Sequence, residues 1–418
     1  MRILIDLQAS QTENRVRGIG RYSWAITEAI ISNAKQHEVW LLLNTAFPES
    51  IRHIRLLLKG KIPEQHIRVF EVPPNIAERN PDNAWRARAA EKIREQSIQN
   101  LNPDVVLITS LFEGFNNDAV TSVGVFSNKV KTAVILYDLI PLWNPQAYLP
   151  TPVINHYYQR KIDSLKRAGL LLAISEYTQQ EAIDVLEVDP QSVVNISAAV
   201  DNRFQPQNLT DQQIDALYQR FGISRKVILY VPGGFDSRKN IDGLITAYSL
   251  LHENLRKNHQ LVIVSKLPDS ERYQIEKQRK KDGLSYEDLL LVGYVEDQDL
   301  VALYNAAALF VFPSKYEGFG LPVLEAMACG APVIASNCTS IPEVVGLKDA
   351  LFDPFSPLAI MKKMAQALRD GVFHEQLCEH GLKQAQQTKH ISGRNLTTPA
   401  NKSQTSSAKN LSHPRQYP

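Results

Sequence analysis

The chain has 418 residues, of which 44% are hydrophobic and 22% are charged. At roughly 150 residues per domain, this length predicts two or three domains, and the composition excludes collagen-like, coiled-coil and largely disordered chains. The 46 Lys and Arg residues nearly balance the 44 Asp and Glu residues, so no overall charge would draw the molecule to nucleic acid or a membrane.

The first apolar run ends at Asp6 and predicts a β-strand rather than a signal peptide. No stretch reaches the roughly 18–20 apolar residues that cross a bilayer. Three cysteines occur without CxxC spacing: Cys329, Cys338 and Cys378. This pattern favours a reduced protein, and we expect a cytoplasmic location. Two basic segments, 51–61 and 85–95, would suit the inner face of a membrane, although a solvated helix face is the commoner explanation.

Apolar, β-branched runs alternate with helical stretches through residues 1–200. The runs are almost continuously apolar, which is typical of strands buried on both faces of a parallel sheet. Strands are predicted at 2–7, 39–44, 67–72, 104–110, 132–138, 170–175 and 193–200. Helices are predicted between them at 20–35, 83–100, 152–167 and 176–186. This series predicts an N-terminal Rossmann-like domain.

A polar stretch without an apolar strand, 201–225, predicts a linker, and a second alternating series fills 226–387. Its strands are predicted at 227–233, 260–266, 289–295, 309–314, 331–336 and 350–354, and its last helices at 356–370 and 374–386. We therefore expect an α/β protein of two Rossmann-like, doubly wound parallel-sheet domains. If the two faced one another, ligands would bind in the cleft at the carboxyl ends of their strands.

Helical periodicity ends after Gln387, and residues 388–418 are rich in Ser, Thr, Asn and Gln. This composition predicts a disordered tail. The tail holds five basic residues and no acidic one, so the rest of the chain has 41 basic residues against 44 acidic ones.

The most informative segment is KYEGFGLPVLEAMACGAPVIAS, 315–336, where a loop joins a strand to a helix. Gly318 and Gly320 would let the backbone approach a ligand, and the N–H groups at the start of the helix favour an anion. Glu317 and Glu325 are eight residues apart, and each carboxylate can accept two hydrogen bonds from a sugar diol. The alternative is a glycine turn followed by an ordinary helical glutamate.

The segment PGGFDSRKN, 232–240, follows the first strand of the second domain. Its glycines, one of which is Gly233, give a flexible turn, and Arg238 and Lys239 stand just before a helix. Two cations beside a helix N-terminus would suit a diphosphate. A solvated basic turn is the alternative.

Two segments of the first domain also lie at strand ends. Gly18 and Gly20, in VRGIGRY, resemble a truncated dinucleotide fingerprint, with a tight strand-to-helix turn as the alternative. Tyr137 and Asp138 end a buried strand, where sites form, although Asp138 could equally cap the turn that follows.

Several signals point away from other chemistries. The histidines lack HxH or HExxH spacing, and neither GxSxG nor a P-loop occurs. Asp297 and Asp299 form a DxD pair, but they precede a predicted helix, where a capping role is the better explanation. No metal site is therefore predicted.

These motifs resemble those of the group 1 (family 4) retaining glycosyltransferases, which have the GT-B architecture. EGFGLPVLEAMACGAPVIAS looks like the family's E-x7-E signature, and it is accompanied by GGFDSRKN, GIGRY, LVGYVEDQDLVALYNAAALFVFPS and SIPEVVG. The likeness covers the second domain nearly end to end and the first more loosely. It implies a metal-independent enzyme without a cofactor that moves a hexose, such as mannose, from a nucleotide-diphosphate sugar to a glycan or lipid-linked acceptor with retention.

The resemblance implies roles by position. Arg238 and Lys239 would hold the diphosphate and stabilise the departing charge, Glu325 would bind the ribose diol, and Glu317 would hold the sugar. The further donor contacts that it implies are Gly18, Gly20, Gly233, Val295, Gly318, Phe319, Gly320 and Leu321. Val295 would meet the base edge, and Tyr137 and Asp138 would lie on the acceptor side.

The chain departs from the family pattern in two places. Many members have His where this chain has Tyr137, and members usually continue after the last helix with another, aromatic-containing one. Two alternatives therefore stay open: a nucleotide-sugar epimerase, which shares the architecture, and an inactive nucleotide-sugar-binding protein with an altered C-terminus.

Overall fold

A computed structural model of the chain describes residues 1–126, 130–234 and 236–395. The described residues divide into two compact units, one of Met1–Ile196 together with 393–395 and the other of Ser197–Ser392. The polar stretch 201–225 belongs to the second unit, where Leu217 is buried and the Tyr218 hydroxyl donates to the Ala306 carbonyl oxygen at 3.3 Å.

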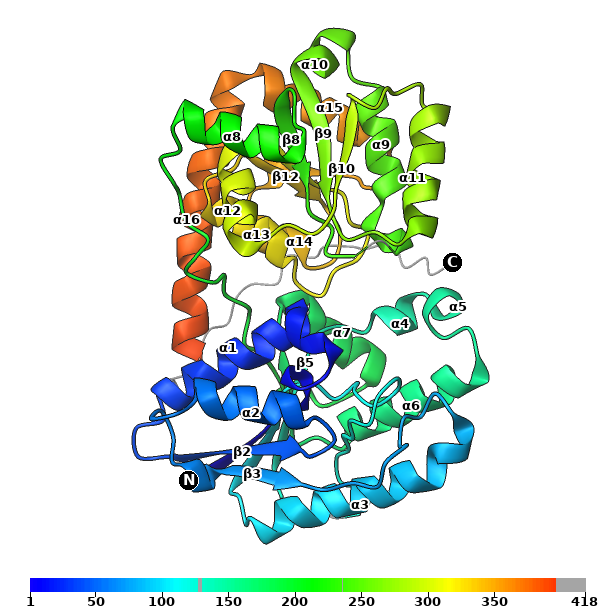
Figure 1. The fold of residues 1–418 in the computed structure, drawn as a ribbon, viewed down its shortest axis with the longest axis vertical. Coiled ribbons are helices and arrows are strands. Elements are labelled where there is room, and N and C mark those ends of the chain that lie inside the picture. The colour runs from blue at the N-terminus through cyan, green and yellow to red at the C-terminus, as the bar shows by residue number, and fades with distance from the viewer. Residues whose placement is uncertain (127–129, 235, 396–418) are drawn as a thin grey trace. The chain divides into compact units, whose positions relative to one another are not determined.

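The first unit is built on a seven-stranded parallel sheet in the order β3-β2-β1-β4-β5-β6-β7 (Figure 1). Its strands are β1 (Arg2–Asp6), β2 (Glu38–Asn44), β3 (Ile67–Phe70), β4 (Val105–Ile108), β5 (Thr132–Leu136), β6 (Leu170–Ala173) and β7 (Val193–Asn195). Its helices are α1 (Gly18–Ser32), α2 (Pro48–Leu57), α3 (Ala84–Asn100), α4 (Ile140–Trp143), α5 (Pro145–Tyr148), α6 (Pro152–Lys166) and α7 (Glu176–Leu186). The central strands β1, β2, β4 and β5 are mostly buried, as their apolar runs predict, whereas the edge strands β3 and β7 have exposed interior residues.

The second unit has a six-stranded parallel sheet in the order β10-β9-β8-β11-β12-β13. Its strands are β8 (Lys226–Tyr230), β9 (His259–Val264), β10 (Leu289–Val292), β11 (Ala307–Phe312), β12 (Val333–Ser336) and β13 (Leu351–Phe352). Its helices are α8 (Asp211–Phe221), α9 (Ile241–Ser249), α10 (Glu253–Asn258), α11 (Asp269–Lys281), α12 (Asp297–Ala306), α13 (Leu321–Ala328), α14 (Ile341–Val345), α15 (Pro357–Arg369) and α16 (Gly371–Asn395). Helices α9 and α11 lie on one side of the sheet, and α12 and α13 lie on the other (Figure 1).

All thirteen predicted strands are confirmed, but most end earlier than predicted. The predicted strand 193–200, for example, ends at Asn195, and the predicted strand 309–314 ends at Phe312. The residues that follow are often buried as well, so apolar character continues where the ladder of hydrogen bonds has ended. Helices α2, α4 and α5 were not predicted. No helix in the described part of the chain is long and apolar enough to span a membrane.

The end of the second unit differs from the prediction. Helix α16 runs to Asn395, so residues 388–395 are helical where a disordered tail is expected from composition. No proline lies between Gly371 and Pro399, and extending an existing helix adds a hydrogen bond for each residue without a new nucleus. The remaining tail residues, 396–418, lie outside the described part of the chain.

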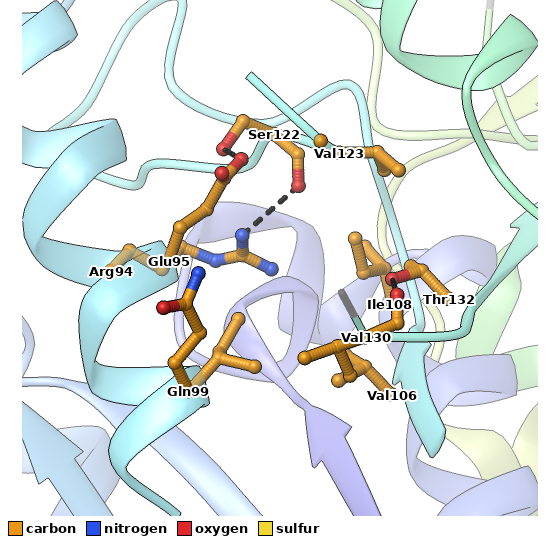
Figure 2. Close-up of a pocket in the computed structure, with 11 residues that line it drawn as sticks. Arg94, Glu95, Gln99, Val106, Ile108, Ser122, Val123, Val130 and Thr132 are labelled. Carbon is orange, nitrogen blue, oxygen red and sulfur yellow. Dashed lines mark hydrogen bonds between the residues drawn. The ribbon is translucent and has the colours of Figure 1, made fainter. Parts of the chain in front are cut away.

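A buried ion pair lies at the centre of the first unit. Arg94 and Asp6 have side chains 1% exposed, and Arg94 Nε donates to Asp6 Oδ2 at 2.7 Å. Arg94 Nη1 also donates to the Ser122 carbonyl oxygen at 3.0 Å, and Ser122 Oγ donates to Glu95 Oε1 at 2.7 Å. Figure 2 shows Arg94, Glu95 and Ser122 opposite the aliphatic side chains of Val106, Ile108 and Val130. The pair therefore ties α3 to the carboxyl end of β1.

We expect Arg94→Met to lower the free energy of unfolding by about 3–5 kcal/mol, because the Asp6 carboxylate would stay buried without its cation. Urea denaturation followed by circular dichroism measures this loss. Arg55→Met is the control, since Arg55 pairs with Glu64 at the surface and such pairs contribute about 1 kcal/mol or less. Equal losses in the two variants would contradict the prediction.

Candidate active site

The strand order places two loops of the second unit together. In the order β10-β9-β8-β11-β12-β13, the connections leave β8 and β11 in opposite directions, and a crevice forms at the carboxyl ends of such a pair. The loop after β8 is 231–240, and the loop after β11 is 313–320. These are the two segments in which the sequence places its cations and its first glutamate.

The turn that carries Arg238 and Lys239 is fixed by Asn240. Asn240 has a φ of 56°, in the left-handed region that asparagine tolerates better than most residues. Its Nδ2 donates to the carbonyl oxygens of Pro313 at 3.1 Å and Pro354 at 2.7 Å. One side chain thus connects the turn after β8 to the loops after β11 and β13.

The cations and the loop glutamate form one cluster. Arg238 Nη1 donates to Glu317 Oε2 at 2.9 Å, and Lys239 Nζ donates to Glu317 Oε1 at 2.6 Å. Lys239 is 6% exposed and Glu317 is 8% exposed. Burial alone would raise the pKa of the Glu317 carboxyl, but the charges of Lys239 and Arg238 outweigh it and hold this pKa below its ordinary value. Glu317 is therefore ionised. Arg238 Nε also lies 3.0 Å from Asp236 Oδ1, so two carboxylates balance the two cations.

The Glu317 loop is held by hydroxyl groups on the segment after β12. The Glu317 backbone N–H donates to Thr339 Oγ1 at 3.0 Å, and Ser340 Oγ donates to the carbonyl oxygens of Glu317 and Phe319, each at 2.9 Å. Gly320 has a φ of 107°, and a Cβ there would lie 2.5 Å from Ile341 Cδ1. Only glycine fits at this position.

Gly320 is also the N-cap of α13, which begins at Leu321 with Pro322 in its first turn. The first N–H groups of a helix lack partners within the helix and favour an anion. Glu325 lies one turn further along α13 and is partly buried. Its Oε2 accepts a 3.0 Å hydrogen bond from the hydroxyl of Tyr304 on α12. The two glutamates thus differ in their surroundings: Glu317 accepts from two cations, whereas Glu325 accepts from a phenol and interacts electrostatically with Arg203.

The other predicted donor residues of the second unit lie in the loops after β8, β10 and β11. Gly318 and Phe319 are buried in the Glu317 loop. Gly233 has a φ of 65° in the loop after β8. Val295 is buried after β10, which is the edge strand and lies two strands from β8.

In the first unit, the two predicted glycines have different environments. A Cβ on Gly20 would lie 2.2 Å from the Asn14 carbonyl oxygen and 2.5 Å from Arg15 Cα, whereas a Cβ on Gly18 would meet nothing within 4 Å. Gly20 is therefore explained by the close approach of the preceding loop, which is the tight-turn alternative. Gly18 has open space where a Cβ would be.

The predicted acceptor residues are both engaged within the first unit. The Tyr137 hydroxyl lies 3.0 Å from Ser23 Oγ and donates to the carbonyl oxygens of Thr109 at 3.0 Å and Ile19 at 3.3 Å. It therefore ties the strand end to α1 rather than pointing outward. Asp138 Oδ1 accepts from the Ile140 N–H at 3.1 Å, which fits the capping alternative.

Sequence reasoning missed a second buried glutamate. Glu113, in the loop after β4, is 2% exposed and accepts hydrogen bonds from Thr12 at 3.1 Å, Asn14 at 2.9 Å and Ser110 at 2.9 Å. Burial raises the pKa of this carboxyl, because its partners are neutral. Nothing in the motif spacing marks Glu113, since two of its three partners, Thr12 and Asn14, lie about 100 residues earlier in the chain. Tyr304 and Ser340 were missed for the same reason.

The two aspartates of the DxD pair form ion pairs with arginines of the protein and do not cap α12. Glu296 is the N-cap of α12 and makes no side-chain capping bond, so the predicted cap is wrong. Asp297 pairs with Arg203, and Asp299 accepts from Arg220 at 2.8 Å. Among the residues that the structure describes, no group of three or more His, Cys, Asp or Glu side chains could hold a metal ion.

The cluster after β8 and β11 can bind and stabilise a polyanion. Arg238 and Lys239 supply two positive charges from one turn, and the N-terminus of α13 adds partial positive charge nearby. Glu317 keeps these cations in place while the site holds no ligand, and Glu325 offers a carboxylate to hydroxyl groups. Such an arrangement suits a sugar joined to a diphosphate.

Comparison with known proteins points the same way. The family model described as glycosyl transferases group 1 matches residues 214–386. The serotype-specific mannosyltransferase WbdA of Escherichia coli is 37% identical over 386 residues, which are 92% of this chain and 46% of WbdA. O-antigen chain mannosyltransferase B of Escherichia coli is 32% identical over 273 residues, which are 65% of this chain and 69% of that protein. The chain thus spans less than half the length of WbdA.

Solved structures share the fold at lower identity. HepE of Anabaena, in complex with UDP and glucose, has a TM-score of 0.65 at 17% identity, and the match covers 94% of this chain and 97% of HepE. WaaG, a glycosyltransferase involved in lipopolysaccharide biosynthesis, has a TM-score of 0.64 at 16% identity, and the match covers 96% of this chain and 100% of WaaG. The predicted GT-B fold class is confirmed.

We expect Gly20→Ala to destabilise the protein by roughly 1–3 kcal/mol, because the added methyl group would collide with the backbone of Asn14 and Arg15. Gly18→Ala should change stability by less than about 0.5 kcal/mol, since its Cβ meets open space. Thermal unfolding of both variants compares these effects. A Gly20 variant as stable as the Gly18 variant would refute the close-approach explanation.

The lowered pKa of Glu317 predicts how stability depends on pH. A carboxyl with a depressed pKa contributes stability that is fully present above its unfolded pKa, about 4.3 for Glu, and is lost as the pH falls through the folded pKa. The stability difference between wild type and Glu317→Gln should therefore be constant from pH 7 to 5 and shrink below about pH 4.3. Urea unfolding at each pH measures this difference. With the exposed Glu287→Gln as control, a gap that persists at pH 3 would argue against the ion cluster.

Proposed function

The chain belongs to the group 1 glycosyl transferases, and we propose that it transfers a hexose, mannose first among the candidates, from a nucleotide-diphosphate sugar to a glycan or lipid-linked acceptor. The observation that carries this proposal is the cluster of Arg238, Lys239 and Glu317 at the strand-order reversal of the second unit. It places two fixed cations where a diphosphate would bind and could exchange their carboxylate partners for its own oxygens.

Two comparisons support the donor and the sugar. HepE has been solved with UDP and with UDP-glucose, which favours a nucleotide sugar as donor. WbdA and O-antigen chain mannosyltransferase B are mannosyltransferases, which favours mannose and a polysaccharide product. Because the chain covers 46% of WbdA, the reaction of that whole protein is taken only as a guide.

The proposed reaction breaks the bond between the sugar's anomeric carbon and the diphosphate oxygen. The acceptor hydroxyl forms the new bond to that carbon, and the nucleoside diphosphate leaves with the bonding electron pair. The proton of the acceptor hydroxyl passes to an oxygen of the departing diphosphate. Negative charge then develops on the diphosphate, and preorganised cations stabilise charge at that point most effectively. Arg238 and Lys239 would supply this stabilisation, so the proposal includes transfer without a divalent metal.

Three further roles are proposed from position. Glu325, partly buried on α13, would accept hydrogen bonds from the ribose diol. Glu317 and the first backbone N–H groups of α13 would hold the sugar once a diphosphate has taken up part of the cations' charge. Retention of the anomeric configuration is proposed from family membership.

The test is transfer of labelled sugar from a panel of nucleotide sugars, GDP-mannose and UDP-glucose among them, in the presence of EDTA. Lys239→Ala should lower kcat by about 100- to 1,000-fold, because one charge facing the leaving group is lost. Glu325→Ala should mainly raise the KM for the donor, by about tenfold. Lys257→Ala serves as control, because Lys257 is an exposed lysine paired with Glu253 and should not affect the rate.

The products separate the remaining possibilities. Transfer abolished by EDTA would overturn metal independence, and an unchanged rate in Lys239→Ala would overturn the site. An epimerised donor without acceptor would indicate the epimerase, and donor binding without turnover would indicate an inactive binding protein.

A further inference from the structure

Tyr304, on α12, is a fully buried tyrosine whose hydroxyl faces the Glu325 carboxylate. The hydroxyl donates to Glu325 Oε2 at 3.0 Å, and the tyrosine is 0% exposed. Helix α12 precedes β11 in the chain and α13 follows it, so this hydrogen bond links the two helices that β11 connects.

The ring of Tyr304 is held on two sides by aromatic neighbours. Its centroid lies 5.9 Å from that of Phe204 and 5.5 Å from that of Phe310, and both pairs are packed edge to face. Phe204 is 3% exposed and Phe310 is 0% exposed. Since edge-to-face packing fixes a ring in place, the hydroxyl has one direction in which to donate.

The hydroxyl stays protonated over the whole working range of pH. Burial, together with the negative charge of Glu325, holds the pKa of Tyr304 well above its ordinary value. The phenol is therefore a permanent donor, and Glu325 Oε2 has a partner at any pH at which the carboxylate is ionised.

Glu325 needs such a partner if it is to bind a ligand in one geometry. A glutamate has three side-chain torsions, and a partly buried one loses much of that freedom when it is ordered. An ionised carboxylate offers about four acceptor positions, so it accepts the Tyr304 hydrogen bond and a pair of vicinal hydroxyls together. The bond from Tyr304 orders the carboxylate before the ligand arrives.

We propose that Tyr304 is a positioning residue that presents the Glu325 carboxylate to the ribose diol of a bound nucleoside diphosphate. This inference rests on the proposed function, which assigns the diol to Glu325. Because Tyr304 acts only through Glu325, losing its hydroxyl weakens the binding of nucleotides that have the diol. Nucleotides that lack the diol should bind as before.

Calorimetric titration of the full chain with GDP and UDP, and with their 2′,3′-dideoxy counterparts, tests this dependence. We expect wild type to prefer the ribonucleotide by about tenfold, which is the size of effect that a charge-assisted hydrogen bond gives. Tyr304→Phe should weaken the ribonucleotide by about five- to tenfold and leave the dideoxynucleotide within twofold. The double variant Tyr304→Phe with Glu325→Gln should bind the ribonucleotide nearly as well as Glu325→Gln alone, because both changes remove the same interaction.

Two variants serve as controls. Tyr248→Phe removes another fully buried hydroxyl of the same unit, one that donates to the His259 carbonyl oxygen at 2.8 Å, and should leave the preference for the diol unchanged. Phe204→Leu keeps the Tyr304 hydroxyl but loosens the packing of its ring. Its affinity for the ribonucleotide should lie between those of wild type and Tyr304→Phe. It also provides the measurement if Tyr304→Phe folds poorly.

The outcomes separate this inference from the proposed function. If wild type binds neither nucleotide, the proposed function fails. If wild type prefers the ribonucleotide and Glu325→Gln abolishes that preference while Tyr304→Phe keeps it, only the inference is overturned. Equal weakening of the ribo- and dideoxynucleotides by Tyr304→Phe would show a purely structural role and would also overturn it.

Discussion

One buried carboxylate, Glu317, joins the two loops from which the candidate site of the second unit is built. Removing an ion from water costs several kcal/mol, and only well-placed partners offset that cost. Arg238 and Lys239 are such partners, with donor atoms 2.9 Å and 2.6 Å from the carboxylate oxygens. The dependence is mutual, since the buried Lys239 needs a counter-ion as much as Glu317 does. The cations are therefore in position before any diphosphate binds.

The two units show how one topology supports opposite electrostatics. Glu113 follows β4 and Glu317 follows β11, and each strand is the fourth in its sheet, immediately beyond the reversal of strand order. Glu113 accepts from neutral donors, and burial raises its pKa. Glu317 accepts from two cations, which lower its pKa. The fold places a buried glutamate at the same point twice, and its neighbours decide whether neutral donors or cations hold it.

The groups proposed to touch a ligand are few, and hydrogen bonds from further out fix each of them. Tyr230 donates to the Lys239 carbonyl oxygen at 2.6 Å, Asn240 ties the same turn to two other loops, and Ser340 holds the Glu317 loop. Tyr304 does the same for Glu325. Such outer groups keep reactive side chains within a few tenths of an ångström of one geometry, which catalysis by positioned charge requires.

The sequence by itself determined the strands, the two α/β units and the motifs of the site, because apolar runs, glycine turns and E-x7-E spacing are local features of the chain. Most strands predicted from it are too long, because burial continues where strand pairing has ended. The last helix is predicted too short, because a helix can continue beyond its amphipathic pattern. Only the tertiary structure decided that Arg238 and Lys239 meet Glu317, nearly 80 residues away, and that Tyr304 meets Glu325. It also decided that Gly20 serves packing and that the Tyr137 hydroxyl is engaged within its own unit. These pairings depend on which strands lie side by side, and the crossovers between parallel strands set that order without leaving a trace in the spacing of residues.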